Sequence, residues 1–177
     1  MEIVVPEEFK YLYVQNAERP IVKIPNPVLR QVCEPVKKIS KPTLKFIDQM
    51  VVAMTRSNGI GLAAPQMGST QRIIVIAPGS MKPTALINPV IVDTSGEQIG
   101  EEGCLSIPGL YGDVQRALKL TVEAYDTKGR AFALDLQGLP ARVVQHEVDH
   151  LNGVLFIDKV DLATLHWSNP ELHDDDI

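Results

Sequence analysis

The segment QHEVDH, residues 145–150, places two histidines four residues apart, with a glutamate directly after the first. On an α-helix, residues i and i+4 project from the same face, so the imidazoles of His146 and His150 can bind one metal ion. The carboxylate of Glu147 then lies beside the ion, where it can take a proton from water and pass it to a leaving nitrogen. The HExxH pattern therefore predicts metal-dependent hydrolysis.

A third protein ligand decides which kind of hydrolase this is. One candidate is Cys104 in EEGCLSIP (101–108), where the preceding glycine allows the backbone to approach an ion closely. The other is Glu171, 21 residues after His150, which follows Asn169-Pro170 at the start of an acidic tail, where no helix is expected. The thiolate is favoured over the glutamate. Position 156, where some HExxH proteases have a third histidine, is phenylalanine.

One thiolate and two imidazoles leave a fourth position open to water, which is a catalytic arrangement. A closed structural site would need Cys33 as a fourth ligand, but Cys33 lies on a short amphipathic segment that favours simple burial. These are the two cysteines of the chain, and reduced thiols are expected for both.

The chain of 177 residues is predicted to be a single catalytic domain, 1–177, with an irregular or strand-like N-terminal extension (1–20) and a flexible acidic tail (163–177). The net charge of −5 argues against direct nucleic-acid binding. The N-terminus carries glutamates and has no basic region before an apolar one, and no apolar run is long enough to span a membrane. A cytoplasmic location is therefore expected.

Hydrophobic periodicity predicts helices and strands in a particular order. Residues 26–33 favour a short helical segment with Asn26 as N-cap, and a longer helix is expected from residue 41 to Asn58-Gly59. Strands are predicted at 71–78 and 84–92, a hairpin at 118–138, and a final helix at 139–151, which contains the HExxH pattern. Strands grouped before a last helix indicate an α+β fold.

Three motifs in order, GIGLAAPQ (59–66), EEGCLSIP (101–108) and QHEVDH (145–150), resemble those of the peptide deformylases. The resemblance extends from about Ile21 to about Lys159. It implies small, mainly antiparallel sheets packed around the C-terminal HExxH helix. It also implies hydrolysis that removes the formyl group from the N-terminal formyl-methionine of nascent polypeptides and releases formate.

The resemblance assigns roles to individual residues. Cys104, His146 and His150 would bind one divalent metal ion, Fe²⁺ in the native enzyme, with Zn²⁺, Ni²⁺ or Co²⁺ as substitutes. Glu147 would be the general acid and base. The side-chain amide of Gln66 and the backbone N–H of Leu105 would stabilise the oxyanion.

Residues expected to contact the substrate surround these groups. The backbone of the small-residue run after Gly59 is suited to pairing with an extended substrate. The candidate substrate-binding residues are Gly59, Ile60, Gly61, Leu105, Tyr111, Leu139 and Val143. Behind the ligands, Glu102 is expected to hold a ligand histidine through its second ring nitrogen, and Arg116 to pair with Asp149.

Partners and alternatives stay open at this stage. N-formylmethionyl peptides are the expected substrates, and a monomer or a dimer is compatible with the sequence. The short acidic C-terminus argues against ribosome docking through a basic C-terminal helix. The competing interpretations are an HExxH endopeptidase that uses Glu171, a structural metal domain that uses Cys33, and a deformylase scaffold that acts on another formylated amine.

Overall fold

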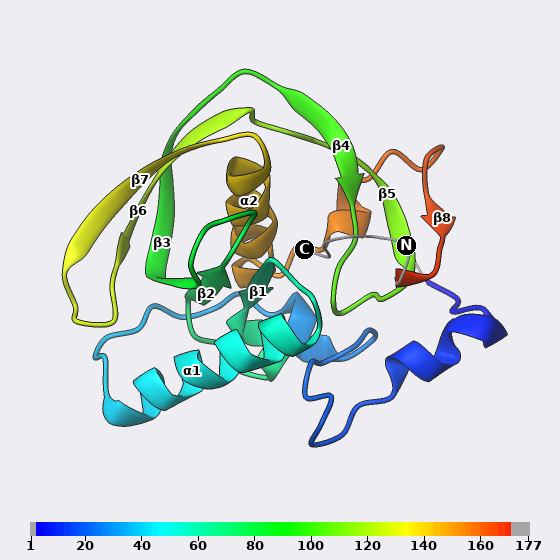
Figure 1. The fold of residues 1–177 in the computed structure, drawn as a ribbon, viewed down its shortest axis with the longest axis horizontal. Helices are drawn as coiled ribbons and strands as arrows, with labels where there is room; N and C mark the ends of the chain where they lie inside the picture. The colour runs from blue at the N-terminus through cyan, green and yellow to red at the C-terminus, as the bar shows by residue number, and fades with distance from the viewer. Residues whose placement is uncertain (1–2, 171–177) are drawn as a thin grey trace.

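A computed structural model describes residues 3–170, in which six consecutive strands, β2 to β7, precede the second long helix (Figure 1). The elements are α1 (Lys41–Arg56), β1 (Gly61–Ala63), β2 (Ile73–Ile76), β3 (Thr84–Ser95), β4 (Gln98–Glu102), β5 (Leu110–Arg116), β6 (Lys119–Tyr125), β7 (Ala131–Gln137), α2 (Leu139–Leu151) and β8 (His166–Trp167). Short 3-10 helices occupy Glu7–Tyr13, Pro27–Arg30, Ala64–Met67 and Phe156–Asp158.

The strands form two antiparallel sheets on either side of α2. One sheet has the order β1-β2-β3-β6-β7, and the other has the order β4-β5-β8. Figure 1 shows α2 enclosed between the two sheets, with α1 along the far side of β1 and β2. The predicted α+β class, with mainly antiparallel sheets around the HExxH helix, is confirmed.

Two connections carry the chain from one sheet to the other. β3 continues into β4 through a turn at Gly96, whose φ of 65° lies in the left-handed region that glycine adopts without steric cost. β5 returns into β6 through Ala117 and Leu118. Both connections cross above one end of α2 (Figure 1), so the β4–β5 hairpin faces α2 from the side opposite the five-stranded sheet.

The buried side chains fall into separate apolar clusters. Val143, Val144 and Leu151 of α2 pack with residues of β2, β3 and β6. Ile47, Met50 and Met54 of α1 pack with β1, β2 and Leu105. The third cluster surrounds β5 and contains Val114, Cys104, Leu155 and Phe156. The helix with both histidines and the loop with Cys104 therefore belong to different parts of the core.

Most of the predicted elements are present. Both long helices are confirmed, and the hairpin forms with Tyr125 paired to Ala131. Asn26 caps the Pro27–Arg30 helix by accepting a hydrogen bond from the Val28 N–H. The strands β1, β4, β5 and β8 were not predicted. β1 and β8 are very short, and β4 and β5 carry glycines and charged residues in place of a regular apolar alternation.

The N-terminal extension was expected to be irregular or strand-like, but Glu7–Tyr13 forms a 3-10 helix. The Phe9 ring packs against Trp167 at a centroid distance of 5.2 Å, which joins the two ends of the described chain. Of the predicted acidic tail, His166–Trp167 pairs with β5, and residues 171–177 lie outside the described part. Among residues 3–170, none of the helices combines the length and apolar character needed to cross a membrane.

Asn88 in β3 generates a stability prediction. Its φ is 53°, and its side chain accepts a hydrogen bond from Val36 N at 2.8 Å and donates one to Val36 O at 3.0 Å. Asn88→Ala removes both bonds and places an alanine in the left-handed region, so we expect a loss of about 2–3 kcal/mol in the free energy of unfolding. Asn88→Gly also removes both bonds, but glycine adopts this φ without steric cost. Its loss in the free energy of unfolding should therefore be about 1 kcal/mol smaller. Equal losses in urea unfolding would contradict this account of the backbone.

Candidate active site

Helix α2 presents its two histidines to the loop that follows β4. It begins at Leu139 and ends before Asn152, so His146 and His150 lie one turn apart, with ring centroids separated by 5.1 Å. The Sγ atom of Cys104 lies 3.4 Å from His150 Nε2. One ligand atom from each of these three residues lies within 4.8 Å of the others, and all three residues are buried.

The unsatisfied polar atoms at this point fit a bound cation. His146 Nε2 and both carboxylate oxygens of Glu147 are buried without a hydrogen-bond partner among the described residues. Buried polar atoms normally have partners, so such a concentration marks a site for a ligand. A thiolate and two imidazoles suit a divalent transition metal ion.

Cys33, the alternative cysteine ligand, does not join this cluster. Cys33 is buried with a free thiol in the apolar cluster of α2, and it is not part of the three-residue group. Glu171 lies outside the described residues. Cys33 and Cys104 are not joined by a disulfide in the described chain.

Burial changes the proton affinity of two residues here. It raises the pKa of Glu147 well above the usual glutamate value, and the negative charge of Glu102 adds to this effect. Burial also lowers the pKa of His150 well below its usual value, with a further contribution from His146. His150 is therefore neutral and offers a lone pair to a metal, and Glu147 is a stronger proton acceptor than an exposed carboxylate.

Gln66 is held with its amide nitrogen toward the cysteine. It lies in the Ala64–Met67 helix, is fully buried, and accepts a hydrogen bond from Ala63 N through Oε1 at 2.8 Å. This bond fixes the orientation of the amide, so Nε2 lies 3.6 Å from Cys104 Sγ and 3.2 Å from Ser106 Oγ. Leu105 follows Cys104 directly, and its carbonyl accepts a hydrogen bond from the side chain of Lys23.

β1 passes so close to α2 that only glycine fits at position 61. A Cβ atom there would lie 2.4 Å from Glu147 Oε1 and 2.9 Å from Val143 Cγ1. Ile60 and Val143 belong to one apolar cluster, next to this contact. The structure thus gathers Ile60, Gly61, Val143 and Glu147, four of the residues singled out from the sequence.

The other candidate substrate-binding residues lie farther from this contact. Gly59 is half-buried between α1 and β1, and Leu139 is the first residue of α2, with 42% of its surface exposed. Tyr111 is buried in β5, where it pairs with His166 of β8, and the two rings are 6.2 Å apart. Tyr111 therefore belongs to the three-stranded sheet and not to the β1 side of the site.

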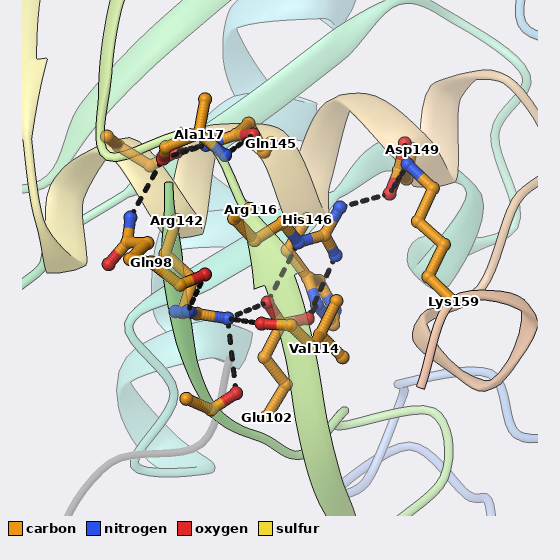
Figure 2. Close-up of polar contacts among 12 residues, drawn as sticks. Gln98, Glu102, Val114, Arg116, Ala117, Arg142, Gln145, His146, Asp149 and Lys159 are labelled. Atoms are coloured by element: carbon orange, nitrogen blue, oxygen red, sulfur yellow. Dashed lines mark hydrogen bonds and ion pairs between the residues drawn. The ribbon is translucent and has the colours of Figure 1, made fainter. Parts of the chain in front are cut away.

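A buried charge network surrounds the side chain of His146 (Figure 2). Arg116 donates from Nε and Nη2 to the two carboxylate oxygens of Glu102, each at 2.9 Å, and from Nη1 to Asp149. Lys159 also contacts Asp149. Glu102 Oε2 lies 2.9 Å from His146 Nδ1. The Arg116–Asp149 and Glu102–His146 contacts are those that the sequence analysis expected.

The charge state of Glu102 determines the tautomer of His146. Burial alone opposes ionisation, but the hydrogen bonds from Arg116 and His146 outweigh it and hold the pKa of Glu102 well below its usual value. An ionised carboxylate only accepts hydrogen bonds, so His146 must donate through Nδ1–H. Its Nε2 lone pair is then free to face the metal position.

Other residues of the network were missed from the sequence. Arg142 donates to Glu102 Oε1 at 2.8 Å, and Gln145 makes two hydrogen bonds to the backbone of Ala117. Both side chains stand on the face of α2 that carries His146. Arg142 and Gln145 stand four residues and one residue before His146, and this spacing was the signal that could have identified them. Their partners, however, are remote in sequence.

The network predicts how stability changes with pH. Because the folded pKa of Glu102 lies below its unfolded value of about 4.3, its contribution is complete above that pH and is lost as the pH falls further. In metal-free protein, we expect Glu102→Gln to lower the free energy of unfolding by about 3 kcal/mol at pH 7, and by less at pH 3.5. Urea unfolding at both pH values measures the difference in the free energy of unfolding between wild type and Glu102→Gln.

The matched control is Glu101→Gln on the same strand, where the side chain is 42% exposed. This change should have little effect on stability at either pH. A gap between wild type and Glu102→Gln that stays constant between pH 7 and pH 3.5 would contradict the assignment of an ionised, buried carboxylate.

Comparison with known proteins points to one family. The family model described as Polypeptide deformylase matches residues 18–165. A peptide deformylase from Halothermothrix orenii is 51% identical over 141 residues, which cover 79% of this chain and 92% of the relative. A protein named peptide deformylase 1 from Bacillus anthracis is 48% identical over 141 residues, covering 79% of this chain and 90% of the relative.

Solved structures agree with the sequence comparison. A peptide deformylase from Legionella pneumophila superposes with a TM-score of 0.78 at 40% identity, covering 82% of this chain and 87% of the other. A peptide deformylase from Synechococcus elongatus, solved in complex with actinonin, gives a TM-score of 0.79 at 42% identity, covering 84% of each chain. With the Cys/His/His cluster in place, the chain belongs to the polypeptide deformylase family of metal-dependent hydrolases.

Proposed function

We propose that this protein removes the formyl group from the N-terminal formyl-methionine of newly made polypeptides in the cytoplasm, and that the chain acts as a single catalytic domain. The observation that carries the proposal is the buried group of Cys104, His146 and His150 next to the unpartnered carboxylate of Glu147. Membership of the deformylase family supplies the substrate class.

Cys104, His146 and His150 would hold one divalent metal ion. When bound, the ion acts as a Lewis acid that polarises the formyl carbonyl and increases the acidity of water. Three protein ligands leave room for water or substrate. Fe²⁺ is proposed as the native ion, and Zn²⁺, Ni²⁺ and Co²⁺ as substitutes, because thiolate and imidazole accept all four.

Glu147 would move the proton in the reaction. Its carboxylate takes a proton from the attacking water, whose oxygen forms a bond to the formyl carbon. The same proton then passes to the amine nitrogen as the C–N bond breaks, which yields formate and a free N-terminus. The raised pKa of Glu147 suits both transfers, since a general base works best when its pKa approaches the pH of operation.

Gln66 and Leu105 would stabilise the negative charge that develops on the formyl oxygen. Gln66 Nε2 lies on the Cys104 side of the site, and the bond from Ala63 N to Oε1 fixes the orientation of the amide before substrate binds. The backbone N–H of Leu105 directly follows the cysteine ligand. Donors fixed in advance in a buried site stabilise an oxyanion far more than water does.

The substrate would lie along β1 with its methionine side chain against α2. Gly61 allows close approach to Glu147, and Ile60 and Val143 provide an apolar surface for the side chain. Gly59, Leu105 and the half-exposed Leu139 are proposed to extend this surface. Tyr111, on the neighbouring sheet, is proposed to affect substrate preference beyond methionine.

Formate release tests the proposal. Protein purified without oxygen, with its metal content measured, should hydrolyse formyl-Met-Ala-Ser at about one metal ion per chain, and chelation should abolish the activity. We expect Glu147→Gln to keep the metal and to lower kcat by at least about 10²-fold, because it cannot accept the proton. Fully metallated wild type that releases no formate would refute the proposed substrate, and other N-formyl compounds would then be tested.

The oxyanion donor has its own test. Gln66→Leu should lower kcat by about 10²–10³-fold while the metal content stays at the wild-type level. Ser106→Ala is the control, since it removes a hydrogen-bond partner of Gln66 but leaves the amide and its bond to Ala63 in place. If Ser106→Ala reduced kcat as much as Gln66→Leu, the amide would have no direct role in the transition state.

A further inference from the structure

The proposed metal ligands come from two different apolar clusters of the core. The apolar residues of α2 pack against the five-stranded sheet, whereas Cys104 belongs to the cluster around β5 and Phe156. One ring of the second cluster, Phe156, stacks on His146 at a centroid distance of 6.3 Å. The remaining contacts that set the distance between Cys104 and the two histidines are those that join α2 to the β4–β5 hairpin.

A row of polar side chains makes that connection. Arg142, Gln145, His146 and Asp149 stand on one face of α2, and each contacts the β4–β5 hairpin or the residue after it (Figure 2). Gln145 accepts from Ala117 N and donates to Ala117 O, both at 3.0 Å. We call these four side chains the polar seam. Arg142, His146 and Asp149 contact charged side chains, whereas Gln145 contacts only the neutral backbone of Ala117.

Arg142 makes the most connections in the polar seam. Its Nη1 donates to Glu102 Oε1 at 2.8 Å, to the Val114 carbonyl at 2.8 Å and to the Gly100 carbonyl at 3.2 Å. Its side chain is 5% exposed. A Cβ atom at Gly100 would lie 3.3 Å from Arg142 Nη2, so the strand leaves space for the guanidinium.

Two guanidinium groups share one oxygen of Glu102. Arg142 and Arg116 both donate to Oε1, one from the helix and the other from β5. Oε2 then faces His146 Nδ1, with a further bond from Arg116. Arg142 stands one helical turn before His146, so both side chains project from the same face of α2. Arg142 contacts one oxygen of the Glu102 carboxylate, and His146 contacts the other.

We propose that Arg142 is a positioning residue for the metal, an inference that rests on the proposed metal site. It holds Glu102 in the orientation that directs His146 Nε2 to the ion, and it ties the histidine helix to the hairpin that leads into Cys104. Loss of Arg142 should weaken metal binding by relaxing both constraints. Partners of metal-binding histidines commonly change metal affinity by about 10–100-fold.

Metal affinity and the absorption of bound cobalt separate this role from a merely structural one. Removing one partner of a buried ion pair is usually destabilising, although Arg116 still donates to both oxygens of Glu102 when Arg142 is lost. Arg142→Met is therefore expected to lower stability as well as metal affinity, and a shift of the cobalt band, which a general loss of stability would not cause, reports the changed orientation of the ligands. Arg142→Met fills the same space without donating. Gln145→Ala is the matched control, because it removes two hydrogen bonds between the same helix and the hairpin but touches neither Glu102 nor His146.

The experiment titrates Co²⁺ into full-length, metal-stripped protein in competition with a chelator, and records the thiolate-to-cobalt absorption band and the thermal unfolding of the metal-free protein. We expect Arg142→Met to weaken Co²⁺ affinity by at least about 10-fold and to shift the band, with Gln145→Ala close to wild type in both. Arg142→Lys keeps the charge but cannot bridge Glu102 and two carbonyls, so its affinity should lie between those of wild type and Arg142→Met.

Wild-type affinity in Arg142→Met, or equal weakening in Arg142→Met and Gln145→Ala, would overturn the proposal. If Arg142→Met does not fold, wild-type affinity and an unshifted band in Arg142→Lys would overturn it equally. Failure of the wild type to bind Co²⁺ through its thiolate would refute the metal site itself, and this inference with it. Failure to release formate despite normal Co²⁺ binding would refute only the proposed substrate.

Discussion

The buried, ionised carboxylate of Glu102 is the constraint on which the site depends. A charge inside a protein is tolerated only when it is paired and fully hydrogen-bonded, and Glu102 receives bonds from Arg116, Arg142 and His146. Because these donors come from β5 and α2, satisfying one carboxylate fixes the helix relative to the hairpin. The same contact determines which nitrogen of His146 remains available for a metal.

The topology explains why such a connection is needed. The chain crosses one end of α2 twice, from β3 into β4 and from β5 into β6. One continuous segment therefore contributes strands to both sheets around the helix (Figure 1). Helix α2 packs against the five-stranded sheet through apolar side chains, and its polar side chains face the β4–β5 hairpin. Apolar contacts are non-directional, whereas hydrogen bonds specify distance and angle, which suits the side of the helix that must bring two histidines close to Cys104.

Close backbone approach is the second requirement of the site. Gly61 leaves no room for a side chain between β1 and Glu147, and Gln66 at the end of the same segment is held by the backbone of Ala63. A single short stretch therefore supplies a surface for an extended peptide, proximity to the acid–base residue and an oriented amide donor. This arrangement places the proposed substrate, proton carrier and oxyanion donor on one side of the proposed metal position.

The sequence by itself determined what is local or carried by a motif: both long helices, the shared face of His146 and His150, and the family through its three motifs. It also ranked Cys104 above Glu171 and suggested the partners of Glu102 and Asp149. Only the tertiary structure decided that Glu102 is shared by two arginines and that β4 and β5 form the second wall. Helical periodicity depends on residues three and four apart, whereas Arg142 contacts partners 28 to 44 residues away. Strand pairing between such segments leaves little trace in either sequence.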